Sequence, residues 1–100
     1  MRAEFLRRHG YRVLVSCNGF ETMDLCGREL VDAVVLDLDG NRHEVALIAR
    51  EIKQRHPDVP TIMLTGASAK VDGVHELADA LVPKEDRPEL VKSLHQLLTA

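Results

Sequence analysis

The chain has 100 residues, of which 45% are hydrophobic and 29% charged, a composition that indicates one small globular domain, residues 1–100, and excludes a disordered chain. No apolar run approaches the roughly 18 residues of a membrane-spanning helix, so no membrane contact is expected. The formal net charge of −3 and the lack of a basic stripe argue against a nucleic-acid binder. The first residues lack the apolar centre of a secretory signal, which favours a cytoplasmic location.

Apolar residues recur at helical spacing in five segments, with polar residues between them. Helices are predicted over residues 2–9, 20–30, 44–55, 68–78 and 88–98. Gly10 follows the first helix and suits a left-handed cap. Asn18-Gly19 predicts a turn ahead of the second helix. Asp86, with Glu89 three residues later, predicts the start of the last helix.

Four short runs rich in β-branched residues predict strands. They cover residues 11–17, 32–38, 61–66 and 79–84. One helix lies between each pair of predicted strands, a spacing typical of parallel crossovers. The runs at 34–36 and 62–64 are continuously apolar, as expected for strands that are covered on both faces. The sequence therefore predicts an α/β fold with a parallel sheet of four strands and helices on both faces.

Two cysteines, Cys17 and Cys26, are too few for a disulfide framework or a four-cysteine zinc site. Both are expected to be reduced and fairly buried, as in a cytoplasmic protein. A disulfide between them is the alternative.

Polar residues stand at or just beyond the ends of three predicted strands: Asp37, Thr65 and Lys84. Ligands of parallel α/β sheets gather at the carboxyl ends of the strands. Each residue also has a plainer interpretation, because Asp37 and Thr65 can simply end a strand and Lys84 can be a solvated lysine beside Glu85. Three polar residues from three strands at one rim are more informative than any one of them, and we take them as the candidate site.

Four stretches, which together cover nearly the whole chain, resemble the receiver domain of two-component response regulators. They are EFLRRHGYRVLVSCNGFETMDL (4–25), DAVVLDLD (32–39), EIKQRHPDVPTIMLTG (51–66) and LADALVPKEDRPELVKSLHQLL (77–98). The second stretch resembles the strand that ends in the family's phosphoacceptor aspartate. The resemblance implies a flavodoxin-like, three-layer fold and a signalling module rather than an enzyme.

The resemblance also implies roles for the residues at the rim. Asp37 would be the phosphoacceptor of a histidine kinase, with the Thr65 hydroxyl and the Lys84 ammonium contacting the phosphoryl group. A Mg²⁺ ion would be held by Asp37, by the backbone carbonyl of Asp39 and by an acidic pair at the end of the family's first strand. Phosphoryl transfer depends on such positioning and charge neutralisation, and Mg²⁺ prefers oxygen ligands.

The sequence departs from the family pattern around this metal. It begins within what resembles the family's first helix, so the first strand and its acidic pair are absent. The loop after the phosphoacceptor reads GNRHEV (40–45) instead of a Met-Pro-Gly-Met-Asp-Gly-like run. Glu85 stands where the family has a proline, and Leu81 where it has an aromatic residue. Asp39 and Glu44 are the carboxylates nearest in sequence that could replace the missing pair.

These departures lead us to expect a receiver-like module that acts through protein contacts, with impaired or absent Mg²⁺-dependent phosphorylation. A working phosphoacceptor at Asp37, served by a histidine kinase, is the alternative. An independent hydrolase or nucleotide binder is disfavoured, because the sequence has no Gly-rich phosphate loop and no pairing of a nucleophile with a base.

The absent strand would normally lie between the strands at 12–16 and 33–37. A buried hydrogen-bonding group without a partner costs about 1–3 kcal/mol, against a total stability of about 5–15 kcal/mol for a domain of this kind. The two strands could pair directly, a second copy could cover the gap, or the domain could be poorly stable alone. Of these outcomes we expect a homodimer across the gap.

Overall fold

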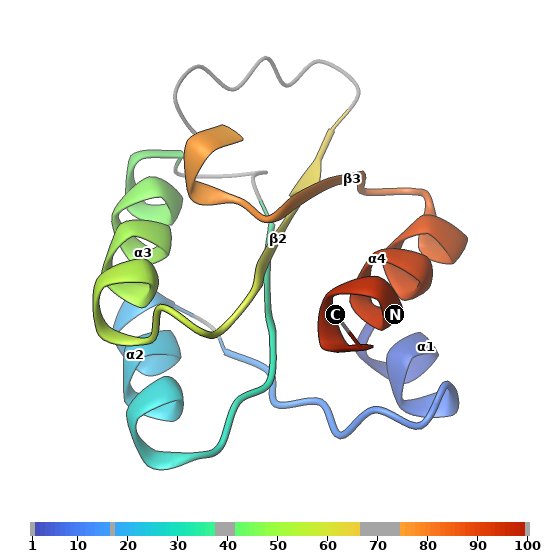
Figure 1. Ribbon diagram of the computed structural model, residues 1–100, viewed down its shortest axis with the longest axis horizontal. Coiled ribbons are helices and arrows are strands. Elements are labelled where there is room, and N and C mark those ends of the chain that lie inside the picture. Colours follow the sequence, from blue (N-terminus) through green and yellow to red (C-terminus); the bar gives the residue numbers. More distant parts are fainter. Residues whose placement is uncertain (1, 17, 38–41, 67–74, 100) are drawn as a thin grey trace.

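The fold is an open parallel sheet between two pairs of helices (Figure 1). The structure is a computed structural model that describes residues 2–16, 18–37, 42–66 and 75–99. In chain order the elements are α1 (Arg2–Arg8), α2 (Gly19–Arg28), β1 (Val34–Asp37), α3 (Arg42–Arg55), β2 (Thr61–Thr65), the 3₁₀ turn η1 (His75–Leu77), β3 (Ala80–Pro83) and α4 (Arg87–Thr99). No described helix is both long and apolar enough to cross a membrane.

The three strands are parallel and follow the order β1-β2-β3. The register of β1 on β2 runs from Val34 opposite Thr61 to Asp37 opposite Leu64. On the other side of β2, Thr65 lies opposite Pro83. The carboxyl ends of all three strands therefore meet at one edge of the sheet, which is the edge where the sequence predicts the site.

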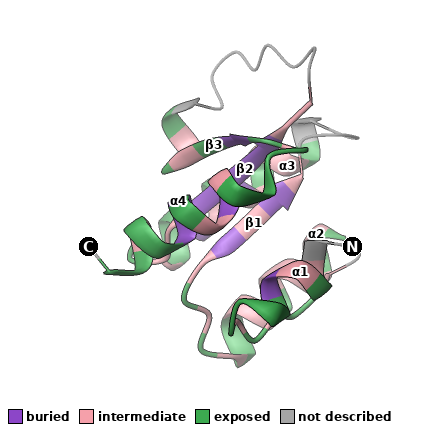
Figure 2. Ribbon diagram, turned by 90° about the vertical axis from the view of Figure 1, so that its right-hand side faces the viewer, coloured by how far each residue is buried: buried purple, intermediate pink, exposed green. Residues whose placement is uncertain are grey.

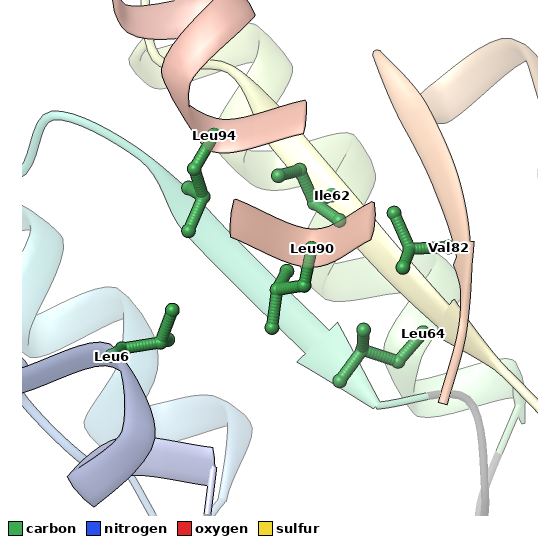
Figure 3. Packing of buried hydrophobic residues seen from close by; sticks show 6 residues of the cluster. All are labelled: Leu6, Ile62, Leu64, Val82, Leu90 and Leu94. Carbon is green, nitrogen blue, oxygen red and sulfur yellow. The ribbon is translucent and has the colours of Figure 1, made fainter. Parts of the chain in front are cut away.

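Two hydrophobic clusters cover the two faces of the sheet. One joins β1 and β2 to α3, and its buried members are Val34, Leu36, Ala49, Ile52 and Met63. The other joins the sheet to α1 and α4, and its members are Leu6, Ile62, Leu64, Val82, Leu90 and Leu94 (Figure 3). Successive residues of β2 point into opposite clusters, which confirms the strand buried on both faces that its continuous apolar run predicts.

Helix ends form where the sequence provides capping residues. The Asn18 side chain accepts a hydrogen bond from the Glu21 amide at 2.8 Å and so begins α2. The Asp86 side chain accepts one from the Glu89 amide at 3.1 Å and begins α4 in the same way. Gly10 takes φ = +91° after α1, a conformation that suits glycine because it has no Cβ. These local signals confirm the predicted positions of the turn and both caps.

The prediction of a strand over residues 11–17 is wrong for the part of it that the structure describes. Among residues 11–16, which are the described part of the predicted strand 11–17, none pairs with β1 or with any other described strand. The Tyr11 amide bonds back to the Leu6 carbonyl at 3.2 Å, and the Val13 carbonyl accepts from the Arg7 guanidinium at 3.1 Å. An apolar run becomes a strand only where a neighbouring backbone lies within hydrogen-bonding distance, and direct pairing of this segment with β1 does not occur.

The predicted helix over residues 68–78 is described only at its end, where His75–Leu77 form a 3₁₀ turn. Residues 67–74 are not among those the structure describes. The three-layer parallel α/β fold is confirmed, with three strands in place of the predicted four.

Candidate functional site

The three predicted site residues lie at the carboxyl edge of the sheet. Asp37 is the last residue of β1, Thr65 is the last residue of β2, and Lys84 comes directly after β3. The parallel register brings these positions together, because equivalent ends of parallel strands share one edge.

Lys84 connects the other two residues. Its ammonium nitrogen Nζ lies 3.4 Å from Oδ2 of Asp37, and its backbone amide donates a hydrogen bond to the Thr65 carbonyl at 2.8 Å. The second contact fixes the backbone from which the lysine side chain reaches across the edge. Sequence reasoning therefore selected residues that the fold brings together.

The Asp37–Lys84 contact is partly open to solvent, since 33% of the lysine side chain and 34% of the aspartate side chain are exposed. Solvent screens a pair of this kind, so its contribution to folding stability is only about 0–1 kcal/mol. Its chemical effect is local, because a mobile ammonium group beside a carboxylate compensates negative charge there. The arrangement leaves the carboxylate accessible and places a cation where an attached anionic group would lie.

The described residues supply few ligands for a divalent metal ion. Asp37 ends β1 at this edge, and Asp39 lies in the part of the loop that the structure does not describe. The Oε1 atom of Glu44 accepts a hydrogen bond from the Gly19 amide, at the start of α2, at 3.2 Å. No group of three histidine, cysteine or acidic side chains gathers anywhere in the described part of the chain. Without such a group the described residues do not by themselves fit a magnesium site, which normally combines carboxylates with further oxygen ligands.

A second polar cluster, which sequence reasoning missed, lies at the opposite end of β2. The Asp79 carboxylate accepts a hydrogen bond from the Thr61 amide at 2.7 Å, and the Asp79 amide donates to the Thr61 carbonyl at 2.8 Å. Lys53 lies 3.7 Å from the same carboxylate. These bonds join the start of β2 to the segment before β3, so the cluster has a structural role. An aspartate at the start of the predicted strand 79–84 was its only signal in the sequence.

The chain is similar to curated response regulators. It is 34% identical over 88 residues to the response regulator MprA of Mycobacterium sp. (strain KMS), and 32% identical over 88 residues to that of Mycobacterium leprae. Both matches cover 81% of this chain, but only 38% of the first relative's length and 39% of the second's. The chain thus spans less than half of these relatives. No protein-family model matches it.

Solved structures share the fold across nearly the whole chain. The response regulator TrrA of Thermotoga maritima, solved in complex with Mg²⁺-BeF, superposes with a TM-score of 0.84 at 28% identity, covering 96% of this chain and 85% of that one. A CheY-like receiver domain protein of Methanospirillum hungatei gives the same TM-score at 20% identity, covering 98% and 82% respectively, and supports the fold alone. With its parallel sheet, its polar edge and these relatives, the chain belongs to the receiver domains of two-component response regulators.

Proposed function

We propose that these 100 residues act as a signalling module through protein–protein contacts, and that Mg²⁺-dependent phosphorylation of Asp37 is impaired or absent in the module by itself. In this proposal residues 1–100 form one receiver-like domain that is not an enzyme. Asp37 occupies the phosphoacceptor position, and Thr65 and Lys84 occupy the positions of the residues that contact the phosphoryl group.

The observation that carries the proposal is the composition of the rim. Asp37 has Lys84 at 3.4 Å, and no group of three histidine, cysteine or acidic side chains gathers among the described residues. A carboxylate outside a cluster of acidic ligands can receive charge compensation from a lysine, but it does not hold a divalent ion firmly. The backbone carbonyl of Asp39 remains the further ligand that the sequence proposes, and we expect Asp37 and Asp39 together to bind Mg²⁺ weakly.

Intact mass spectrometry tests this proposal. The protein is incubated with a small phosphodonor such as phosphoramidate, with and without Mg²⁺, and the mass is measured for the wild type and for Asp37→Ala. We expect no phosphoryl adduct on either protein. Asp58→Ala is the matched control, because Asp58 is an exposed aspartate in the turn after α3, and it should behave as the wild type does.

An adduct on the wild type and on Asp58→Ala, but not on Asp37→Ala, would overturn the proposal and establish the second candidate. That candidate is a working phosphoacceptor at Asp37, served by a histidine kinase. The contact of the Lys84 ammonium with the Asp37 carboxylate favours this candidate. The similarity to TrrA, which was solved with Mg²⁺-BeF, favours it as well. Binding of beryllofluoride in the presence of Mg²⁺, followed by ¹⁹F NMR, distinguishes the two candidates independently of phosphodonor chemistry.

We further propose a histidine kinase or another signalling protein as the partner, a cytoplasmic location, and a homodimer. The backbone supports the homodimer. Among the described strands β1 pairs with β2 alone. The Val34 amide donates a hydrogen bond to the Pro60 carbonyl on that side. Because strand residues alternate in direction, the Val35 amide and carbonyl face the other edge. An open edge of this kind invites pairing with a second chain.

Size-exclusion chromatography with light scattering measures the oligomeric state. We expect twice the monomer mass at high micromolar concentration. A well-folded monomer under those conditions would refute the homodimer while leaving the proposal about Asp37 untouched.

A further inference from the structure

The turn between β3 and α4 holds the backbone that carries Lys84. The Asp86 amide donates a hydrogen bond to the Pro83 carbonyl at 2.9 Å, so residues 83–86 close as a tight turn. Lys84 follows Pro83 in this turn, and its own amide donates to the Thr65 carbonyl at 2.8 Å. The main chain at Lys84 is thereby fixed to β2 on one side and closed by Asp86 on the other.

Asp86 also begins α4. Its side chain accepts a hydrogen bond from the Glu89 amide at 3.1 Å, and its carbonyl accepts one from the Leu90 amide at 3.1 Å. Leu90 is 1% exposed and belongs to the cluster that joins α4 to the sheet (Figure 3). The outer side of this helix is exposed, whereas the strands behind it are largely buried (Figure 2). One aspartate therefore ties the turn to a helix that is packed on the sheet.

The turn matters because of where the lysine side chain lies. The Lys84 ammonium is 3.4 Å from the Asp37 carboxylate, and both side chains are about one third exposed. Solvent screens a contact of this kind, so the attraction between the two charges does not by itself hold a long and flexible side chain in one place. The position of the lysine therefore depends on how its backbone is held, and Asp86 closes the turn that holds it.

We propose that Asp86 is a positioning residue of the rim, which places Lys84 against Asp37 by closing the turn and capping α4. The hydrogen bonds of its amide, carbonyl and side chain do this, and its negative charge is not required. The inference rests on the proposed function, in which Lys84 occupies the position of a residue that contacts the phosphoryl group. Asp86 acts through Lys84 and not on the phosphoryl group itself.

Carbodiimide cross-linking measures the contact. A water-soluble carbodiimide activates a carboxylate and leaves as a urea when a lysine amine in contact with that carboxylate forms the amide. The Asp37–Lys84 amide is quantified by digestion and mass spectrometry, relative to the amide between Lys53 and Asp79. That second pair lies at 3.7 Å, with 41% and 33% of its side chains exposed, and it serves as a reference within the same molecule.

Asp86→Ala should lower the ratio of the two amides about fivefold, the factor by which a lost N-cap of typical strength shifts a local equilibrium. Asp86→Asn should keep the wild-type ratio, because an asparagine side chain accepts the same hydrogen bond without the charge.

The matched control is Asn18→Ala, because Asn18 caps α2, which packs on the other face of the sheet (Figure 1). It should lower the free energy of unfolding and leave the ratio unchanged. Asp86 and Asn18 are both exposed, so circular dichroism should show that all three variants are folded.

An unchanged ratio in Asp86→Ala, or an equal loss in Asp86→Asn, would overturn the positioning role. A fall of the same size in Asn18→Ala would do so too, because the effect would then reflect a general loss of stability. Wild-type protein that forms the Lys53–Asp79 amide but not the Asp37–Lys84 amide would also contradict the inference. No outcome depends on a phosphodonor, so a phosphoryl adduct on Asp37 would contradict the proposed function and leave this inference standing.

Discussion

The contact between Lys84 and Asp37 balances charge at the rim more than it stabilises the fold. Both side chains are about one third exposed, and solvent screening limits such a pair to about 0–1 kcal/mol. In a double-mutant cycle with Asp37→Ala and Lys84→Ala, measured by urea unfolding, we expect a coupling free energy within that range. A coupling free energy above about 2 kcal/mol would show that the pair is a structural element, contrary to this view.

Cys26 is a free thiol whose environment sets its reactivity. Burial raises the pKa of the Cys26 thiol above its ordinary value, because the thiolate is poorly solvated there. The unfolded chain therefore ionises first as the pH rises. The stability linked to this thiol is fully present below its unfolded pKa and is lost as the pH rises through the folded pKa.

We therefore expect Cys26 to react with a thiol reagent at a higher pH in the folded protein than in the denatured protein. A Cys17→Ser background isolates the signal of Cys26, and the reaction rate is followed against pH in both states. Coincident rate profiles in the native and denatured protein would contradict the effect of burial.

At the scale of elements, the approach of α2 to α3 depends on a glycine. A Cβ built on Gly19 would lie 2.8 Å from Cδ1 of Ile48 and 3.2 Å from Oε1 of Glu44. The same approach lets the Gly19 amide donate to that glutamate at 3.2 Å. The two helices therefore pack closely where α2 begins. This close approach is possible because Gly19 has no side chain.

Gly19→Ala should lower the free energy of unfolding by about 1–3 kcal/mol, the usual cost of overpacking. Gly27→Ala is the control within the same helix, since a Cβ there meets nothing within 4 Å. Replacing a helical glycine by alanine in open space should raise the free energy of unfolding by about 0.5–1 kcal/mol. Urea titrations of the two variants should move in opposite directions, and a shift of the same sign in both would contradict the packing argument.

At the scale of the whole molecule, β2 couples the two hydrophobic clusters. Met63 belongs to the cluster that contains Ile52, while Ile62 and Leu64 belong to the other. Both isoleucines are fully buried. A cavity in either cluster should therefore destabilise the entire fold, since residues of β2 belong to both clusters.

Ile52→Ala and Ile62→Ala should each lower the free energy of unfolding by about 2–5 kcal/mol. Each variant should still unfold in one transition, seen at the same denaturant concentration by circular dichroism and by hydrogen exchange. Two separated transitions would show that the halves fold independently, against the proposal of one domain.

Much of the fold and the rim followed from local patterns. The capping residues Asn18 and Asp86 and the turn glycine Gly10 act through contacts within a few residues, so their positions could be predicted. The contact of Lys84 with Asp37 was expected from strand order and from the resemblance to receiver domains. The use of Glu44 as an acceptor for Gly19 could not be predicted, because it joins helices whose relative placement depends on packing.

The sequence by itself determined the four described α-helices, three of the four predicted strands and the edge at which the polar residues gather, since periodicity and capping are properties of neighbouring residues. Only the tertiary structure decided that residues 11–16 pair with no described strand, because a strand needs a second backbone within hydrogen-bonding distance and local sequence cannot supply one. The same fact leaves Leu14 and Val15 open beside Phe20.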